Sequence, residues 1–232
     1  MDLPGGMDMG SVIIGCGTGR CGTVNLAYLL RQNGVWATHE MRPLLPWKVD
    51  HKLLQERIAY FRSSPKPVAD VAFFYLPYLP YLFTAFPDIR VLVLKRDRAS
   101  TIASLERKVG KRNHWMDHDG ESWKLDPIWD PCFPKFSAKT RREAIGKYWD
   151  FYYREAEKLV RKHPGQVGVF PIEVFNSSVK MRELLEFCGV KPAWIPPQLK
   201  LNQGREGHRD IIGLQVPPGQ GVCIITAEGD DG

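Results

Sequence analysis

The sequence predicts an α/β protein in which helices cover both faces of a central, mainly parallel sheet, giving three layers. Short apolar, β-branched runs alternate with segments of helical periodicity, which is the pattern of repeated strand–helix units. One run, RVLVL at 90–94, is apolar enough to be buried on both faces, as inner strands of a parallel sheet are. Glycines follow the first run and precede the first helix, which indicates a tight turn between them.

The elements follow one another in a regular order along the chain. The predicted strands are Ser11–Gly15, Val35–Thr38, Val68–Val71, Arg90–Leu94 and Val167–Phe170. The first helix begins after the glycine-rich turn, and its leucines keep helical spacing until Gly34 ends it. Further helical patterns cover Lys52–Phe61, Tyr78–Phe86, Ala99–Val109, Lys139–Lys162 and Lys180–Cys188. Prolines before, within and after the Tyr78–Phe86 pattern make it the most interrupted of these helices.

Residues 110–136 break the alternation. This segment is rich in Trp, Asp, His and Pro and has no sustained period, so we expect a long functional loop. Its tryptophans serve either as packing or as a platform for a bound molecule. With 232 residues, 44% of them hydrophobic, the chain suits one domain over 1–232, with irregular segments at 1–10 and 213–232.

Charge points to an anionic partner. The chain has 32 basic and 26 acidic residues, a net charge of +6, and a sequence pI near 9.1. Its basic residues are spread along the sequence without a long run. This distribution argues against nucleic acid as the partner and favours a local anion pocket.

Cysteine usage and the N-terminal segment both favour a cytoplasmic protein. The five cysteines are an odd number without metal-ligand spacing, which indicates neither a disulfide framework nor a metal site. The first ten residues lack the basic and apolar regions of a signal peptide, and no window is apolar enough to span a membrane. Oligomeric state is left open by these observations.

The sequence GCGTGRCGT at 15–23 is typical of a phosphate-binding turn. It lies between a strand and a helix, where glycines let the backbone approach a phosphate and unpaired N–H groups point towards it. A dinucleotide-binding interpretation fits Gly17, Gly19 and Gly22, with Glu40 near the expected acidic position. A P-loop interpretation fails because Arg20 and Cys21 stand where Lys and a hydroxyl residue are required.

A third interpretation rests on two distant motifs. The segment Gly19–Thr23 resembles the 5′-phosphosulfate loop of sulfotransferases, in which a basic residue is followed by a small residue, Gly and Thr. The segment VLVLKRDRASTIAS resembles the family's 3′-phosphate strand and helix, with Arg96 eight positions before Ser104. Eight positions are about two helical turns, so both side chains can reach one phosphate.

The resemblance extends over about the first 190 residues. The segment VFPIEVFNSSVKMRELLEFCGV is similar to the family's late strand, Glu-containing turn and helix, although Ile172 stands where an aromatic residue often helps to hold the adenine. The later segment LNQGREGHRD, with Arg205, suits the family's loop over the cofactor. A solvated polar loop has the same composition.

The resemblance implies sulfuryl transfer from 3′-phosphoadenosine 5′-phosphosulfate (PAPS) to a hydroxyl or amine, with 3′,5′-ADP as product and no metal. The acceptor would be a glycan or a small molecule. Arg20 would balance charge on the leaving group, where the family usually has Lys. The residues implied in binding the cofactor are Gly17, Thr18, Gly19, Arg20, Cys21, Gly22, Thr23, Arg96, Ser104 and Arg205.

The base is expected directly after the second strand. Glu40 is the first candidate, since carbohydrate sulfotransferases have a Glu base near that position, and His39 is the alternative because imidazole titrates near neutral pH. Strand alternation predicts that the two side chains point to opposite faces, so that one of them serves. Asp70, at the third strand, is expected either to orient substrate or to cap a helix.

Two other function classes stay open at this point. One is a Rossmann-type NAD(P)-dependent oxidoreductase, in which Glu40 would bind a ribose and Arg96 and Ser104 would have no role. The other is a non-catalytic nucleotide-binding protein that keeps the fold without turnover. For Arg96 itself, the structural alternative to phosphate binding is a surface ion pair with Asp97 or Glu106.

Overall fold

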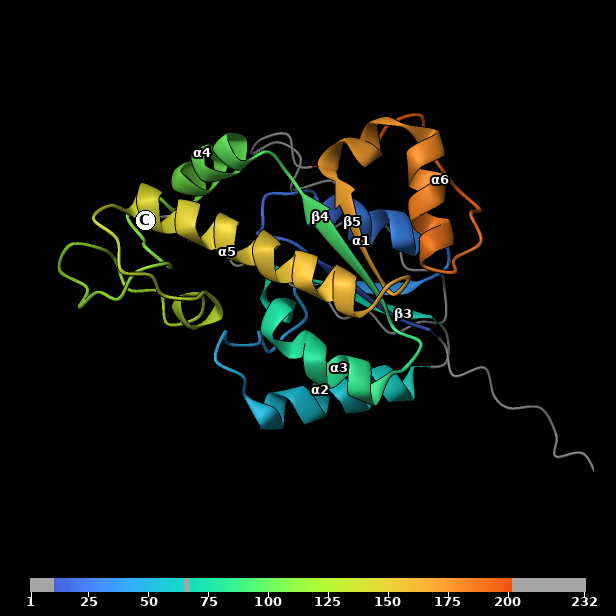
Figure 1. Cartoon of the computed structure of the whole chain (residues 1–232), viewed down its shortest axis with the longest axis horizontal. Helices are drawn as coiled ribbons and strands as arrows, with labels where there is room; N and C mark the ends of the chain where they lie inside the picture. The colour runs from blue at the N-terminus through green and yellow to red at the C-terminus, as the bar shows by residue number, and fades with distance from the viewer. Residues whose placement is uncertain (1–10, 65–66, 202–232) are drawn as a thin grey trace, which may run out of the picture. The chain divides into compact units, whose positions relative to one another are not determined.

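A five-stranded parallel sheet forms the centre of the protein in this computed structural model, which describes residues 11–64 and 67–201 (Figure 1). The strands are β1 (Val12–Cys16), β2 (Trp36–His39), β3 (Val68–Val71), β4 (Arg90–Lys95) and β5 (Val167–Pro171). They lie in the order β2-β3-β1-β4-β5, and every neighbouring pair is parallel. The predicted strands are therefore confirmed, each with a shift of one residue or less at its ends.

The strand order distinguishes this sheet from a Rossmann sheet. In the Rossmann order, the second strand lies beside the first, so that the acidic residue after it reaches a ribose on the first turn. Here β3 separates β2 from β1. The dinucleotide-binding interpretation of the glycines is therefore disfavoured by the topology.

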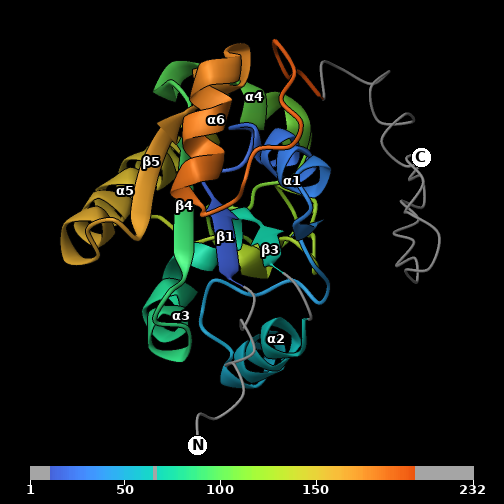
Figure 2. The ribbon, with the colours of Figure 1, turned by 90° about the vertical axis from the view of Figure 1, so that its right-hand side faces the viewer.

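Helices cover both faces of the sheet, as expected (Figure 2). One face carries α1 (Thr23–Gln32) and α6 (Ser178–Phe187). The larger core cluster lies on the opposite face, where side chains of β1 pack against four helices and the 110–136 loop. These helices are α2 (His51–Ser63), α3 (Leu79–Ala85), α4 (Arg98–Val109) and α5 (Arg141–Lys162).

Local differences from the predicted elements have local causes. The proline-interrupted helix divides into a 3-10 segment, η1 (Phe73–Tyr78), which contains Pro77, and the short α3. Residues 110–136 form a loop as predicted, with one 3-10 turn, η2 (Asp130–Cys132). A further 3-10 segment, η3 (Ile172–Asn176), joins β5 to α6.

The described residues up to Lys200 belong to one compact unit. The expectation of a single domain over the whole chain stays a prediction, and the segments 1–10 and 213–232 lie outside the described residues. None of the described helices is both long and apolar enough to cross a membrane.

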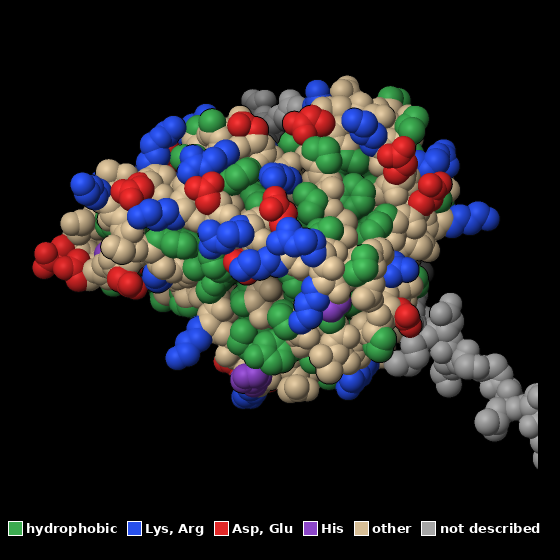
Figure 3. Space-filling model, viewed as in Figure 1, with side chains coloured by type: hydrophobic (Ala, Val, Ile, Leu, Met, Phe, Trp, Pro, Cys, Tyr) green, Lys and Arg blue, Asp and Glu red, His purple; other side chains and the backbone are tan. Residues whose placement is uncertain are grey.

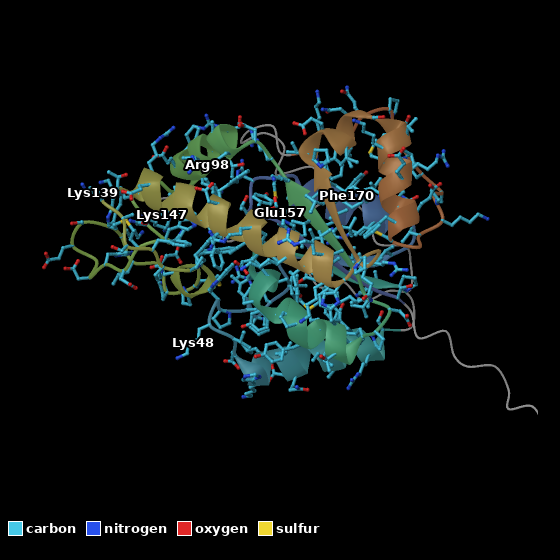
Figure 4. The ribbon with its side chains drawn as sticks, in the orientation of Figure 1. Lys48, Arg98, Lys139, Lys147, Glu157 and Phe170 are labelled. Atoms are coloured by element: carbon cyan, nitrogen blue, oxygen red, sulfur yellow. The ribbon has the colours of Figure 1, made fainter. Side chains whose placement is uncertain are left out.

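Charged side chains on the face formed by α4 and α5 are mixed in sign (Figure 3). Arg98 donates two hydrogen bonds of 2.8 Å to Asp150 of α5, and Lys147 lies 2.7 Å from Glu143 (Figure 4). Lys95 of β4 lies 3.8 Å from Glu157. These three basic residues are therefore each balanced by a nearby carboxylate, as is common on a solvated surface.

Candidate functional site

The turn between β1 and α1 has the backbone of an anion cradle. Gly17, Gly19 and Gly22 have positive φ angles of 153°, 77° and 91°, and Arg20 has a φ of 56°. A Cβ at Gly17 would come within 2.6 Å of the Leu94 carbonyl oxygen, so only glycine fits there. A Cβ at Gly19 would meet nothing within 4 Å, so the middle of the turn has open space beside it.

The N-terminus of α1 has no side-chain cap, unlike most of the other helices. Gly22 occupies the N-cap position and its backbone is left-handed. By contrast, α2, α4, α5 and α6 are capped by Asp50, Asp97, Thr140 and Ser177, whose side chains accept from backbone N–H groups. Among the described residues, no side chain therefore caps the start of α1, where the helix dipole favours a negative ligand.

Two tyrosines of α5 hold this turn from inside the protein. The Tyr152 hydroxyl accepts a 3.0 Å hydrogen bond from Gly17 N and donates to Phe73 O at 2.9 Å. The Tyr153 hydroxyl donates to Leu94 O at 2.8 Å and lies 3.3 Å from Thr18 Oγ1. Burial raises the pKa of both tyrosines, so their hydroxyls stay neutral. They belong to the core and also fix the turn.

The side chains of Thr18 and Cys21 point into the protein. Both residues are fully buried, and burial raises the pKa of Cys21 to about 12, so its thiol stays protonated. Since a Cβ at Gly17 would lie 2.5 Å from Cys21 Sγ, the thiol fills the inside of the turn. Any contribution of these two residues to a ligand therefore comes from their backbone N–H groups.

Three polar residues from distant parts of the chain meet beside the turn. Arg20 Nε donates to Ser104 Oγ at 3.2 Å, and Arg96 Nη1 donates to the Arg20 carbonyl oxygen at 3.1 Å. Ser104 is buried on α4, whereas Arg20 is exposed. Desolvation, and then the charges of Arg96 and Arg107, lower the pKa of Arg20. The residues that the two motifs single out thus lie close together, and two of the three are cations.

Glu40 follows β2 directly, and its environment favours the protonated carboxyl. Its backbone is left-handed, with a φ of 54°, and its N–H donates to Val71 O at 3.1 Å. Desolvation, and then the charge of Asp70, raise its pKa from 4.5 to about 7, against the opposing effect of Arg42 and Lys108. A carboxyl with this pKa can accept or release a proton near neutral pH.

The expectation that His39 and Glu40 face opposite sides is wrong. His39 Nδ1 lies 4.0 Å from Glu40 Oε2, and His39 Nε2 lies 3.0 Å from Thr23 Oγ1 in the first turn of α1. Alternation applies within a strand, whereas β2 ends at His39 and the left-handed backbone of Glu40 turns its side chain back. The two residues therefore share one side and connect β2 to the glycine-rich turn.

Asp70 caps none of the described helices and belongs to a buried network of hydrogen bonds. It is fully buried in β3, where its Oδ2 accepts from Arg57 Nη1 at 2.9 Å and from the Tyr75 hydroxyl at 2.7 Å. Its Oδ1 accepts from Thr38 Oγ1 at 2.8 Å. Arg57 also donates at 2.9 Å to the carbonyl oxygens of Met41 and Pro43. This buried network fastens the turn that carries Glu40.

The 110–136 loop packs against the core beside this turn. Trp115 is fully buried, and Phe133 stacks on Phe73 with ring centroids 4.3 Å apart. Trp129 is half-buried, and the guanidinium of Arg42 lies 5.5 Å from the centroid of its ring. Trp115 therefore serves packing, whereas Trp129 lies at the edge of the candidate site.

Sequence reasoning missed the cations around Glu40 and the buried Arg57. Arg42 and Lys108 belong to no motif. They are identified by their charges, each of which lowers the pKa of the Glu40 carboxyl. Arg205 lies outside the described residues, as do Asn202 and His208. Within the described ranges, no group of three or more His, Cys, Asp or Glu residues could hold a metal ion.

The fold is similar to that of a solved sulfotransferase from Alicyclobacillus acidocaldarius. The match covers 86% of this chain and 89% of that chain, with a TM-score of 0.52 and 16% sequence identity. No family model matches the chain, and no curated protein matches it by sequence. The chain therefore has a sulfotransferase fold, while its activity has to be argued from the site.

Proposed function

We propose that this protein is a PAPS-dependent sulfotransferase that transfers a sulfuryl group to a hydroxyl or amine of an acceptor and leaves 3′,5′-ADP. The observation that carries the proposal is the meeting of Arg20, Arg96 and Ser104 at the uncapped start of α1. These residues come from β1–α1 and β4–α4, which the parallel sheet brings to one edge. The similarity of fold to a sulfotransferase supports the same conclusion.

The two phosphate groups of such a donor fit two neighbouring parts of this site. Backbone N–H groups from Gly17 to Thr23 would hold the 5′-phosphosulfate, for which the left-handed glycines provide close approach. Arg96 and Ser104 would hold the 3′-phosphate. Arg205 is proposed to close over the bound nucleotide.

When bound, PAPS supplies an activated sulfuryl group with a phosphate as the leaving group. Arg20 would balance the negative charge that develops on the leaving oxygen, since its guanidinium lies at the turn. Glu40 would take the proton of the acceptor hydroxyl as the new oxygen–sulfur bond forms. We assign His39 to orientation, because its Nε2 is engaged with Thr23 Oγ1 and its Nδ1 faces the Glu40 carboxyl.

Calorimetric titration with 3′,5′-ADP and with NAD tests the donor class. We expect 3′,5′-ADP to bind and NAD to give no heat, and we expect Arg96→Ala or Ser104→Ala to weaken the binding about tenfold or more. Arg98→Ala is the matched control, because Arg98 lies on the same helix as Ser104 but pairs with Asp150. Binding of NAD instead of 3′,5′-ADP would favour the oxidoreductase alternative.

A transfer assay with radiolabelled PAPS then separates an enzyme from a non-catalytic nucleotide-binding protein. We expect Glu40→Gln to bind 3′,5′-ADP as well as the wild type does and to lose about 10²–10⁴-fold in transfer, since it removes only the base. A wild-type protein that binds 3′,5′-ADP but sulfates no member of a broad acceptor panel would contradict the catalytic part of the proposal.

A further inference from the structure

Glu40 has two cationic neighbours that the proposed donor site does not use. Arg42 follows it by two residues, and Lys108 lies in the last turn of α4. The charge of each lowers the pKa of the Glu40 carboxyl, and the two residues belong to different elements of the fold. Both are exposed, and within residues 11–64 and 67–201 no carboxylate lies within ion-pair distance of either.

Helix α4 connects these cations to the donor side. Ser104 and Lys108 are four residues apart and therefore lie on one face of the helix, about one turn from each other. Ser104 contacts Arg20, whereas Lys108 acts on Glu40. The same helix face thus passes from the phosphate residues to the candidate base.

An aromatic ring orients Arg42. Its guanidinium lies over Trp129, which stacks on the buried Phe73 with an interplanar angle of 28°. A guanidinium that rests on a ring keeps its N–H donors free at the edge, where they can bind a carboxylate or sulfate with two hydrogen bonds. Trp129 belongs to the 110–136 loop, so this loop contributes to the acceptor side of the site.

This arrangement differs from that of three cations on α4 and α5. Arg98, Arg142 and Lys147 each pair with a carboxylate of α4 or α5. Arg42 and Lys108 instead lie close enough to Glu40 for their charges to lower its pKa, against the desolvation and the Asp70 charge that raise it. Two positive charges beside a carboxyl that is only partly ionised leave a net positive charge, which a ligand can balance.

We infer that the acceptor carries an anionic group, a carboxylate or a sulfate ester, close to the hydroxyl that receives the sulfuryl group, and that Arg42 and Lys108 bind it. This inference rests on the proposed function, because it takes Glu40 as the base that faces the acceptor. The shared chemistry fits either a small hydroxy acid or an acidic sugar residue within a glycan.

Three sugar probes test the inference: glucuronate, glucose as its neutral counterpart, and a uronate-containing oligosaccharide. Each sugar is titrated into the protein by calorimetry, with and without saturating 3′,5′-ADP. The preference for the anionic sugar is thereby measured independently of the identity of the donor. Binding of 3′,5′-ADP is measured in the same series and reports on the proposed function separately. Matched variants are Arg42→Gln and Lys108→Gln, with Lys162→Gln as the control because Lys162 ends α5 at the opposite edge of the sheet.

We expect glucuronate to bind about tenfold or more tightly than glucose, and each matched variant to lose about tenfold for glucuronate while binding of 3′,5′-ADP stays within about twofold of the wild type. Tighter binding of the oligosaccharide would assign the anion to a glycan, and equal binding would assign it to a small acid. Equal binding of glucose and glucuronate, or a loss of glucuronate binding with Lys162→Gln as large as with Arg42→Gln, would overturn the inference.

Discussion

The two sides of the candidate site are held in place by different kinds of contact. The glycine-rich turn is fixed by neutral tyrosine hydroxyls of α5, which bond to Gly17 N and to the backbone of β4. The turn that carries Glu40 is fixed by a buried ion pair between Asp70 and Arg57. A neutral frame keeps its geometry over a wide pH range, whereas a charged one also changes the protonation of its neighbours. The contacts that hold the Glu40 turn in place therefore also influence the protonation of Glu40.

The largest effect should come from breaking the buried ion pair between Asp70 and Arg57. Arg57→Met leaves the buried Asp70 carboxylate unpaired and frees two backbone carbonyls, so we expect the free energy of unfolding to fall by about 3–5 kcal/mol. Chemical denaturation measures this. The control is Arg98→Met, which removes an exposed pair and should cost less than about 1 kcal/mol. Similar losses for both variants would contradict the distinction.

The next largest effect should come from removing the charge of Arg20, which lies on the other side of the candidate site. Arg20→Ala should leave the fold intact, because the side chain is exposed, and should lower the transfer rate about 10²–10³-fold. Steady-state kinetics with saturating PAPS measures the effect on kcat. Arg20→Lys keeps the cation and should recover most of the rate. If Arg20→Ala changes only KM, the residue binds the donor without balancing the leaving charge.

Glu40 connects stability to pH. Its carboxyl keeps its proton up to about pH 7 in the folded protein, whereas in the unfolded chain it loses it near 4.5. The folded state therefore binds more protons between these values, so this residue lowers the stability of the wild type as pH rises through that window. Glu40→Gln should be more stable than the wild type above pH 7, by about 2 kcal/mol after allowance for partial exposure.

The activity should depend on pH in the opposite sense. A base must be deprotonated, so the transfer rate of the wild type should rise with pH and level off above about pH 7. Thermal unfolding and pH–rate profiles of the wild type and Glu40→Gln measure both effects. A rate that is flat between pH 5 and 8 would exclude Glu40 as the base.

The smallest effect should come from removing the hydrogen bond between the neutral Tyr152 hydroxyl and the glycine-rich turn. Tyr152→Phe leaves Gly17 N without its hydrogen-bond acceptor inside the core, which should cost about 1–2 kcal/mol of stability. Because the lost group is neutral, the midpoint of the pH–rate profile should stay where it is in the wild type. Chemical denaturation together with a pH–rate profile measures this. A shifted midpoint would show that α5 also controls the protonation of Glu40.

The sequence alone determined the strands and the glycine-rich turn, and it singled out Arg20, Arg96 and Ser104, whose contacts the structure then showed. These depend on local patterns, namely apolar runs, glycine spacing and an eight-residue interval, together with the rule that parallel strands end at one edge. The rule that parallel strands end at one edge also placed Glu40, which follows β2, at the same edge as the glycine-rich turn.

Only the tertiary structure decided the strand order, the pairing of Asp70 with Arg57, the shared side of His39 and Glu40, and the tyrosine contacts across 135 residues. Each depends on which elements lie next to each other, and no local pattern records that. Glycines at 17, 19 and 22 suit several nucleotide folds, because close approach to a phosphate needs the same small residue in all of them. The neighbours of β1 distinguish these folds, and they are set by packing of the whole sheet.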